Sequence, residues 1–529
     1  MPAVVASDTT RTEHEGVLVN TDVDVVVIGG GPVGATALAL VGRLGLTAVG
    51  LEKDEEMWPT ARAVHFDGET MRTLQGLGIA EKFAAVTIPM KHVEVINESG
   101  EVLVHASTDH FGDQAWNDHI SFHQPDVERL IRGVVDETPG VELRCGVSVT
   151  NLRNVDGGVE VTAVAKDGTA QTVRARWVIA ADGARSGIRQ SLGIQNDKYG
   201  EDAQWLVVDG QLVGAPGYAA DMIQFGRHTR PALWLRLPGT RVRMEFMLMP
   251  DDDPNEIVTP AAVERISRGA LPADKFAPDR QAIYTFRGRI AQQWRSGNVF
   301  LAGDAAHQAP PLFGQGLCAG LRDVANLAWK LELVKRGLAG DELLDTYESE
   351  RKPHATFWVE TAANQAVIIQ TTDPKVAEGR DEFIRANPTA SAVPTSPALG
   401  PGLHEGDRDE RAGKLGMQPI LVDGTRLDDM VGTHFLVVAD RGIYHQLPAP
   451  TKAALDDDGD VVTLLDPLKV GQLLASVGAK AAVIRPDHYI LGVGDTADDL
   501  DRLVHKIPSV ARATPVIATQ TTTVTAETR

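Results

Sequence analysis

Residues 23–53, VDVVVIGGGPVGATALALVGRLGLTAVGLEK, indicate the fold class more clearly than any other part of the chain. An apolar run from Val23 to Ile28 enters a glycine turn and continues into Ala- and Leu-rich helical spacing. A second apolar run then ends at Glu52. This order predicts a strand, a helix and a parallel strand joined by a right-handed crossover, which is the start of an α/β fold.

Gly29, Gly31 and Gly34 form a GxGxxG motif between the predicted strand and helix. The first glycine permits the tight turn, the second lets the backbone approach a pyrophosphate, and the third lets the helix pack on the strand. Glu52 lies 23 residues after Gly29, and Lys53 follows it. This is close to the spacing of about 20 residues expected for a carboxylate that binds ribose hydroxyls. The pattern predicts a dinucleotide site, and a purely structural glycine turn is the alternative.

Two later apolar runs also end in an acid. ARWVIAADGARS carries Asp182, and GNVFLAGDAAH carries Asp304. In open α/β sheets, ligands bind at the carboxyl ends of the strands. Asp304 is placed to accept hydrogen bonds from polyol hydroxyls such as a ribityl chain, which NAD lacks. These two additional acids favour FAD as the dinucleotide.

Composition narrows the class of protein. The 529 residues suffice for about three domains, and a formal net charge of −21 disfavours a nucleic-acid partner. The two cysteines, Cys145 and Cys318, form no CxxC motif, which excludes thiol-redox chemistry. No apolar run approaches the ~20 residues of a membrane span, and the N-terminus lacks the pattern of a secretory signal. We expect a cytoplasmic protein without a metal site or a membrane partner.

We expect a Rossmann-like FAD-binding domain built from separated pieces, an inserted antiparallel-sheet substrate domain and a C-terminal α/β module. In TRVRMEFMLMP, apolar residues at Val242, Met244 and Phe246 alternate with charged ones, which predicts a half-buried strand covering a pocket. The expected division is 1–20 and 511–529 disordered; 21–90, 120–200 and 285–385 FAD-binding; 91–119 and 201–284 substrate domain; 386–402 linker; and 403–510 C-terminal domain.

The combination of GxGxxG, DGARS and GDAAHQAPPLFGQG (303–316) resembles the class A flavoprotein aromatic hydroxylases, which are single-component FAD monooxygenases. The stretch FHQPDVERLIR agrees with that family, and RMEFMLMP and RPDHYILG look most like the 3-(3-hydroxyphenyl)propionate hydroxylase subgroup. The resemblance implies the aromatic hydroxylase fold with a thioredoxin-like C-terminal domain. That domain would serve packing or homodimer formation, because it lacks CxxC.

The resemblance also implies the reaction. NADH or NADPH reduces FAD, and a phenolic compound like 3-(3-hydroxyphenyl)propionate is hydroxylated with O₂ through a flavin C4a-hydroperoxide, in aromatic catabolism. The family has no separate NAD(P)H domain, so a single GxGxxG motif fits. Two alternatives stay open: a tailoring hydroxylase of polycyclic aromatic polyketides, and a protein that binds flavin without turnover.

By this resemblance, the 303–318 segment holds the isoalloxazine ring. Asp304 binds the ribityl or ribose-phosphate side, and the backbone from Gly314 to Cys318 faces the N1–C2=O edge. The N-terminus of the following helix would stabilise the anionic reduced flavin. Many family members have Asn in place of Cys318, which is expected here to be a small buried residue. The expected cofactor contacts are Gly29, Gly31, Gly34, Glu52, Lys53, Arg62, Gln124, Asp182, Asp304, Pro311, Gly314, Gly316, Leu317 and Cys318.

Hydroxylation of a phenol needs a proton acceptor within about 2.6–3.2 Å of the substrate hydroxyl, in a site closed to bulk water. Asp67 stands where phenol hydroxylases of the family carry an acid. His65 has an ordinary pKa of ~6.5, and Tyr284 lies on a predicted strand of the substrate domain. We expect the catalytic residues among these three, with His307 of the flavin loop as a further candidate.

Overall fold

The computed structural model describes residues 22–59, 62–109, 111–214, 218–267, 275–387, 394–406 and 408–513. The N-terminal segment predicted to be disordered, 1–20, lies outside these residues, as does 514–529 of the predicted tail. Residues 511–513 belong instead to the end of helix α16 (Pro508–Ala513).

The predicted strand–helix–strand unit is present at the centre of the first sheet. β1 (Val23–Ile28) lies between β2 (Ala48–Glu52) and β11 (Ala170–Ala180), and all three are parallel. β18 (Val299–Leu301) adds in parallel to β11, and β8 (Val141–Cys145) adds in parallel to β2. The sheet is completed by β17 (Arg295–Ser296) and the hairpin of β9 (Val147–Val155) and β10 (Gly158–Ala165).

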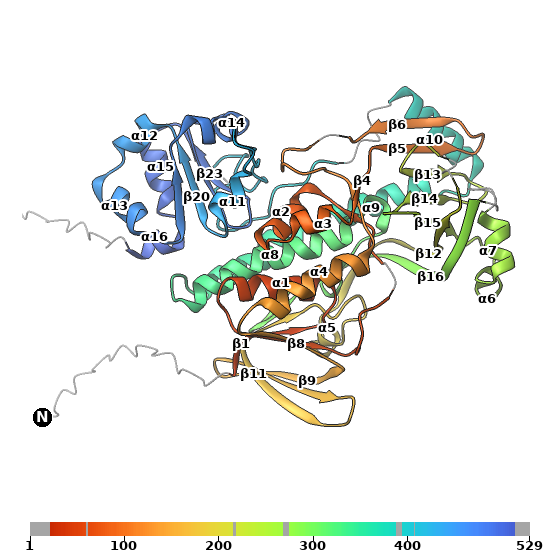
Figure 1. Ribbon diagram of the computed structural model, residues 1–529, viewed down its shortest axis with the longest axis horizontal. Coiled ribbons are helices and arrows are strands. Elements are labelled where there is room, and N and C mark those ends of the chain that lie inside the picture. Colours follow the sequence, from red (N-terminus) through yellow and green to blue (C-terminus); the bar gives the residue numbers. More distant parts are fainter. Residues whose placement is uncertain are drawn as a thin grey trace, which may run out of the picture.

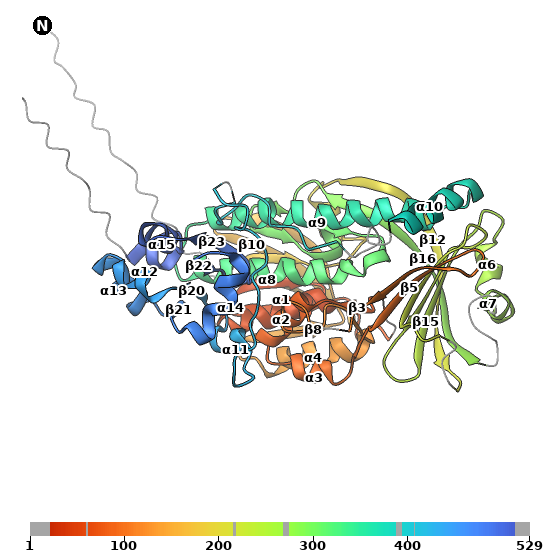
Figure 2. The ribbon, with the colours of Figure 1, turned by 90° about the horizontal axis from the view of Figure 1, so that it is seen from above.

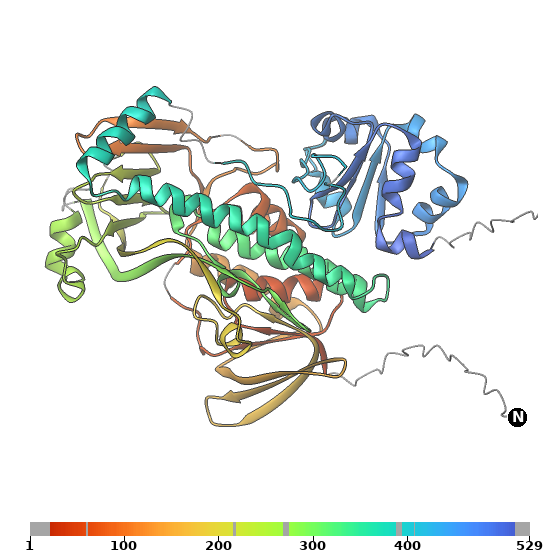
Figure 3. The ribbon, with the colours of Figure 1, turned by 180° about the vertical axis from the view of Figure 1, so that it is seen from behind.

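Helices cover this sheet, which is why its central strands are continuously apolar. α1 (Pro32–Arg43) packs on α4 (Gln124–Glu137) and α8 (Gln315–Lys335). The apolar face of α8 is buried at Leu321, Val324 and Leu331. α9 (Glu342–Ile369) runs along α8 (Figure 3). Shorter elements nearby are α2 (Gly68–Gly76), α3 (Ala80–Ala84), α5 (Gly187–Ser191), β3 (His65–Phe66), β4 (Ile88–Pro89) and β7 (Ile120–Ser121).

A second, eight-stranded sheet lies beyond the first one (Figure 1). One face packs on α6 (Pro254–Ile257) and α7 (Pro260–Ser267), and α10 (Pro374–Ala386) lies beside β6. The strand order is β19 (His307–Gln308), β16 (Phe276–Ala291), β12 (Asn196–Leu212), β15 (Arg241–Met247), β14 (Ala232–Arg236), β13 (Met222–Gly226), β5 (His92–Asn97) and β6 (Val102–Ser107).

The expectation of a half-buried β15 is wrong in one respect. The strand exists, but its charged residues Arg243 and Glu245 are as buried as their apolar neighbours. The sheet face that carries them closes a cavity instead of facing solvent. The alternating pattern therefore predicted the strand and a pocket beside it, but not that both faces of the strand are buried.

The C-terminal module contains the strands β21 (Val461–Leu464), β20 (Phe435–Ala439), β22 (Ala481–Ile484) and β23 (Ile490–Gly494), in that order. β21 is parallel to β20, whereas β22 is antiparallel to both of its neighbours. Figures 1 and 2 show this module at one end of the molecule and the second sheet at the other, with α8 and α9 between them. Its helices are α11 (Leu427–Val431), α12 (Arg441–Gln446), α13 (Ala449–Asp457), α14 (Pro467–Val477), α15 (Ala497–Val504) and α16.

Candidate cofactor and substrate site

Four strand ends meet at one edge of the first sheet. β18, β11, β1 and β2 are neighbours and parallel, so their carboxyl ends lie side by side. Asp304, Asp182, Gly29 and Glu52 stand at or just after these ends. The convergence of distant segments expected from the sequence is therefore present.

The glycine motif leaves no room for side chains where the backbone turns. Gly29 has a φ of +100°, and a Cβ there would lie 2.4 Å from the Ala181 carbonyl oxygen. A Cβ on Gly34 would lie 1.9 Å from the Gly29 oxygen, so this glycine brings α1 against β1. A Cβ on Gly31 would instead point into open space at the cavity. Gly31 thus keeps the backbone open to a ligand, as the motif predicts.

The two acids at the strand ends keep oxygens that are available to a ligand. Asp182 Oδ2 accepts a hydrogen bond from the Ile188 amide at 3.1 Å, but Oδ1 is buried without a hydrogen-bond partner among the described residues. Asp304 is open to the same cavity from a 3₁₀ turn, Gly303–Ala305, and the surrounding protein desolvates its carboxyl and thereby raises its pKa. Since buried polar groups are normally hydrogen-bonded, Asp182 Oδ1 calls for a donor from a ligand.

One cavity of about 1490 Å³ extends from these strand ends to the second sheet. Single-ligand pockets hold roughly 300–1,000 Å³, so the volume suits a dinucleotide together with a second molecule. Most of the predicted site residues line it: Gly29, Gly31, Glu52, Lys53, Arg62, His65, Gln124, Asp182, Tyr284, Asp304, Pro311, Gly314, Gly316 and Leu317. Gly34, Asp67 and Cys318 do not.

The side chain of Gln124 holds the backbone at Arg62. The Gln124 side-chain oxygen accepts hydrogen bonds from the amides of Arg62 and Ala63, each at 2.9 Å. Gln124 thereby fixes the segment that brings Arg62 to the cavity. Glu52 is also partly engaged, because it accepts a hydrogen bond from the Gly30 amide at 2.6 Å. Arg132, which the sequence reasoning missed, lines the cavity too and donates to the Gly30 carbonyl at 2.8 Å.

The segment after β18 is packed tightly against β3. Gly314 has a φ of +64°, and a Cβ there would lie 2.6 Å from His65 Cβ. Cys318 is buried, with its sulfur 3.7 Å from the carbonyl oxygens of His65 and Gly314. The expectation of a small buried residue is confirmed, and burial also raises the pKa of the Cys318 thiol, which disfavours a reactive thiolate.

Asp67 is placed differently from a substrate acid. Its carboxylate caps α2 by accepting from the Thr70 amide at 2.9 Å, and it forms an ion pair with Arg322. Burial acts to raise its pKa, but Arg322 and Thr70 lower it to about 2. A carboxylate held this firmly is a weak proton acceptor for a phenol.

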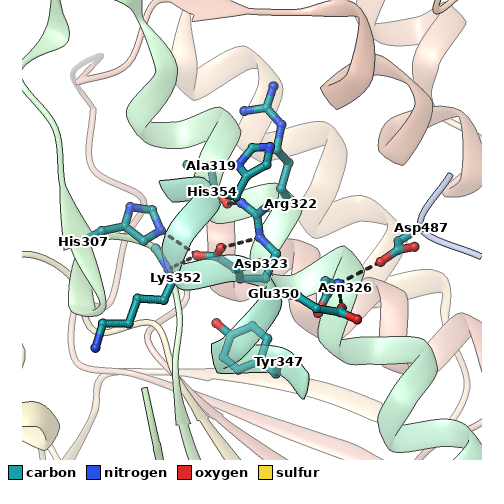
Figure 4. Close-up of polar contacts among 12 residues, drawn as sticks. His307, Ala319, Arg322, Asp323, Asn326, Tyr347, Glu350, Lys352, His354 and Asp487 are labelled. Carbon is teal, nitrogen blue, oxygen red and sulfur yellow. Dashed lines mark hydrogen bonds and ion pairs between the residues drawn. The ribbon is translucent and has the colours of Figure 1, made fainter. Parts of the chain in front are cut away.

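His65 lines the cavity and has a histidine partner that the sequence did not reveal. His65 Nε2 lies 3.1 Å from His119 Nδ1, and both rings face the cavity. Burial and the nearby His119 lower the pKa of His65 to about 4, so His65 is neutral near pH 7. His307 does not line the cavity, because its ring bonds Asp323 at 2.6 Å inside the protein (Figure 4).

The second sheet supplies a polar patch to the far wall of the cavity. Tyr284 Oη accepts a hydrogen bond from Arg280 at 2.6 Å. Arg243 binds both oxygens of Asp209, at 2.7 and 3.0 Å. Glu245 lies 4.0 Å from Arg243, and burial raises its pKa to about 7. Arg243 and Glu245 were not among the site residues expected from the sequence, although the alternation predicted that this strand covers a pocket.

The polar groups that line the cavity fit FAD. Asp182 Oδ1, which has no hydrogen-bond partner within the described segments, suits a dinucleotide with a polyol chain, as do the open space at Gly31 and the long cavity. Within the described residues, no group of three His, Cys, Asp or Glu side chains could hold a metal ion. None of the described helices has the length and apolar character needed to cross a membrane. In this molecule the ligand cavity lies between the strand ends of a parallel sheet and the wall formed by a second sheet. This arrangement is typical of dinucleotide-dependent oxidoreductases.

Comparison with known proteins identifies the family. Residues 22–362 match the family described as FAD binding domain. The probable NADH-specific resorcinol 4-hydroxylase of Rhodococcus jostii (strain RHA1) is 33% identical over 515 residues, covering 93% of this chain and 96% of the relative. A 3-(3-hydroxy-phenyl)propionate/3-hydroxycinnamic acid hydroxylase of Mycolicibacterium smegmatis (strain ATCC 700084 / mc(2)155) is 31% identical over 517 residues, covering 89% and 90%. The chain belongs to the FAD-dependent aromatic hydroxylases, and its cofactor is FAD.

Solved structures agree on the fold. The flavin-dependent monooxygenase PieE superposes with a TM-score of 0.79 at 21% identity, covering 93% of this chain and 100% of PieE. Aklavinone-11 hydroxylase gives 0.76 at 23% identity, covering 92% and 99%. At this identity the likeness concerns the fold alone, so it does not favour the polyketide alternative.

Proposed function

We propose that this protein is a monooxygenase that uses NADH and O₂ to hydroxylate a phenolic ring in aromatic catabolism, in the cytoplasm. The observation that supports it most is the single cavity joining Asp182 and Gly31 to Glu245 and Tyr284. When bound there, FAD supplies the reducing and oxygen-activating chemistry. The relative named as NADH-specific supports NADH over NADPH.

The cofactor residues of the proposal follow the cavity from end to end. Glu52, Lys53 and Arg132 would hold the adenosine and pyrophosphate part, beside Gly29 and Gly31. Asp304 would accept hydrogen bonds from the polyol chain. The loop from Pro311 to Leu317 would face the ring, and Gly34 and Cys318 would contribute through close packing of α1 and α8.

The charged residues of the far wall favour a phenolic substrate whose second polar group is uncharged. Two arginines of the second sheet line the cavity, and each is already paired: Arg243 with Asp209, and Arg287 with Asp202 at 3.1 Å. At this wall a substrate carboxylate would therefore meet Glu245, while both arginines of the wall are already engaged by Asp209 and Asp202. A neutral diol such as resorcinol fits this wall better than a hydroxyphenylpropionate, which remains the second candidate because relatives of that name are similar.

Glu245 is the proposed proton acceptor for the substrate hydroxyl. A general base works best when its pKa lies near the operating pH, and a pKa of about 7 meets this requirement better than that of Asp67. Tyr284 would orient the ring through its hydroxyl, which Arg280 fixes. His65 and His119 would shield the opposite side from water and pass a proton along their shared hydrogen bond.

The C-terminal module is proposed to be a thioredoxin-like domain without redox activity. The support is its strand order, with β20 parallel to β21 and β22 antiparallel between β20 and β23. The proposed boundaries are those expected from the sequence. The long strands β12 and β16, however, run through the boundaries at 200 and 285.

Consumption of NADH by the FAD-loaded enzyme tests the proposed function. Resorcinols, hydroxybenzoates and hydroxyphenylpropionates are added one at a time, and the product mass is measured. We expect neutral diols to accelerate NADH consumption most and to gain one oxygen atom. Stronger stimulation by carboxylated phenols would overturn the substrate class. Yellow protein that no phenol stimulates would favour a flavin-binding protein without turnover.

A further inference from the structure

A buried chain of polar side chains runs behind the cofactor loop to the C-terminal module. Tyr489 Oη donates to Glu69 Oε1 at 2.6 Å, and Arg322 Nε donates to Glu69 Oε2 at 2.5 Å. Arg322 Nη1 donates to Gln315 Oε1 at 2.8 Å, and Nη2 binds Asp67. All five residues are buried or nearly so. The chain therefore spans from the turn just before β23 to the first turn of α8.

On the cofactor side the chain ends at two residues, Gln315 and Asp67, and both lie close in sequence to residues that line the cavity. Gln315 lies between Gly314 and Gly316, which line it, and Asp67 follows His65 by two residues. Because Gly314 packs directly on His65, Arg322 holds together two segments that face the ligand from adjacent directions. A shift of Arg322 would be transmitted to both segments.

The turn that carries Tyr489 is itself firmly anchored. Arg485 binds both oxygens of Glu350, at 2.7 and 2.8 Å. Asp487 accepts from Asn326 at 2.8 Å, as Figure 4 shows beside Glu350. Tyr489 thus reaches Glu69 from a fixed position, and its hydroxyl also lies 3.3 Å from His354 Nε2.

The charge balance explains why a hydroxyl is needed at this point. Arg322 is one cation between two buried carboxylates, Asp67 and Glu69, so one negative charge is left over. Tyr489 supplies a donor to the Glu69 oxygen that Arg322 does not bind. Without it, that oxygen would be buried and unpaired, and Arg322 would be drawn toward Glu69.

We propose that Tyr489 is a positioning residue for the cofactor loop, so that the C-terminal module helps to build the FAD site. This inference rests on the proposed function, because it concerns the binding of FAD. The order of the 315–318 backbone, however, can be measured in the FAD-free protein. The module then has a role beyond the packing or dimer formation expected from the sequence.

The test compares full-length Tyr489→Phe with Tyr444→Phe, the same change in the same module at a hydroxyl that contacts only Asp456 among the described residues, at 3.4 Å. Amide hydrogen exchange of 315–318 is measured in the FAD-free protein. The dissociation constant and visible spectrum of FAD are then measured on reconstitution. For Tyr489→Phe we expect faster exchange, an FAD dissociation constant raised about tenfold and a shifted flavin spectrum, whereas Tyr444→Phe stays like the wild type.

Asp460→Asn separates positioning from general docking. Asp460 pairs with Arg336 at 2.6 Å, between the module and the C-terminal end of α8, whereas Gln315 and Arg322 lie toward the N-terminal end of that helix. This change should lower the unfolding temperature slightly while leaving FAD affinity unchanged. The inference is overturned if Tyr489→Phe matches Tyr444→Phe in exchange and affinity, or if Asp460→Asn weakens FAD binding as much.

Two further outcomes are kept distinct. If wild-type protein takes up no FAD, the proposed function fails, and exchange at 315–318 still decides the role of Tyr489. If Tyr489→Phe does not fold, Glu69→Gln replaces it, since this change weakens the bond to Arg322 while keeping the side-chain shape. Unchanged amide exchange at 315–318 and unchanged FAD affinity in Glu69→Gln would then contradict the proposed positioning role.

Discussion

At the scale of single residues, the carboxyl groups of the site differ because of their surroundings. Arg322 and Thr70 hold the pKa of Asp67 at about 2 despite its burial, whereas burial raises the pKa of Glu245 to about 7. Asp182 keeps one oxygen without a hydrogen-bond partner in the described parts of the chain. The sequence placed acids at strand ends correctly, but ionisation depends on neighbours hundreds of residues away, and Asp67 and Arg322 are 255 residues apart.

The first prediction concerns the proposed base. In the wild type, kcat/KM should rise with pH through about 7 as Glu245 loses its proton. Glu245→Gln should lose this rise and lower kcat/KM about a hundredfold or more. Steady-state rates with a neutral diol across the pH range measure both effects. Glu201→Gln, an exposed site on β12, is the matched control. A Glu245→Gln profile that keeps the rise would assign the base elsewhere.

The same substitution has a predicted effect on stability. A folded pKa of about 7 against 4.5 for an ordinary Glu means that the folded state binds more protons between these values. Wild-type stability therefore falls as pH rises from about 4.5 to about 7, and the loss persists above. Relative to wild type, FAD-free Glu245→Gln should gain up to about 3 kcal/mol in unfolding free energy across this window. Urea unfolding at both ends of the window checks this, and a constant difference would contradict it.

At the scale of elements, close backbone contacts make the site. The glycine turn and the strand ends were predictable because their spacing is local. The contact of Gly314 with His65 was not predictable, since it joins β3 to the start of α8. The alternation in β15 predicted the strand and a pocket beside it, but it did not reveal that Arg243 and Glu245 are buried at the cavity wall.

Gly314→Ala should disturb this contact. A methyl group at a φ of +64°, 2.6 Å from His65 Cβ, forces apart β3 and the cofactor loop. We expect FAD affinity to fall about tenfold or more, since left-handed backbone and steric overlap add their costs. Fluorescence titration of FAD-free protein measures it. Gly133→Ala, in α4 with open space around its Cβ, should leave affinity intact; equal affinity of both variants would refute the steric account.

At the scale of the whole molecule, buried ion pairs bind the C-terminal module to α8 and α9. Arg485, Glu350 and Lys330 are each fully buried, and Lys330 binds Glu350 at 2.7 Å. The RPDHYILG motif was visible in the sequence, but its partners were not. Glu350 lies 135 residues from Arg485, and Glu69 lies 420 residues from Tyr489. Docking of distant segments is thus the part that sequence patterns left undetermined.

Arg485→Gln should weaken this docking strongly. Removing one partner of a buried ion pair costs about 3–5 kcal/mol, because the other charge is left uncompensated. Denaturant unfolding should show that loss, with the C-terminal module unfolding before the rest. Arg385→Gln removes an exposed pair with Glu101 and should cost less than about 1 kcal/mol. Similar losses for the two variants would show that the buried network contributes little.

The most direct measurement for the whole account is the origin of oxygen in the product. FAD-loaded protein is given NADH and resorcinol under isotopically labelled dioxygen, and the product is analysed by mass spectrometry. The account predicts a ring hydroxylated with one labelled oxygen atom, formed in step with NADH consumption. An unhydroxylated ring, or a product whose new oxygen comes from water, would contradict it.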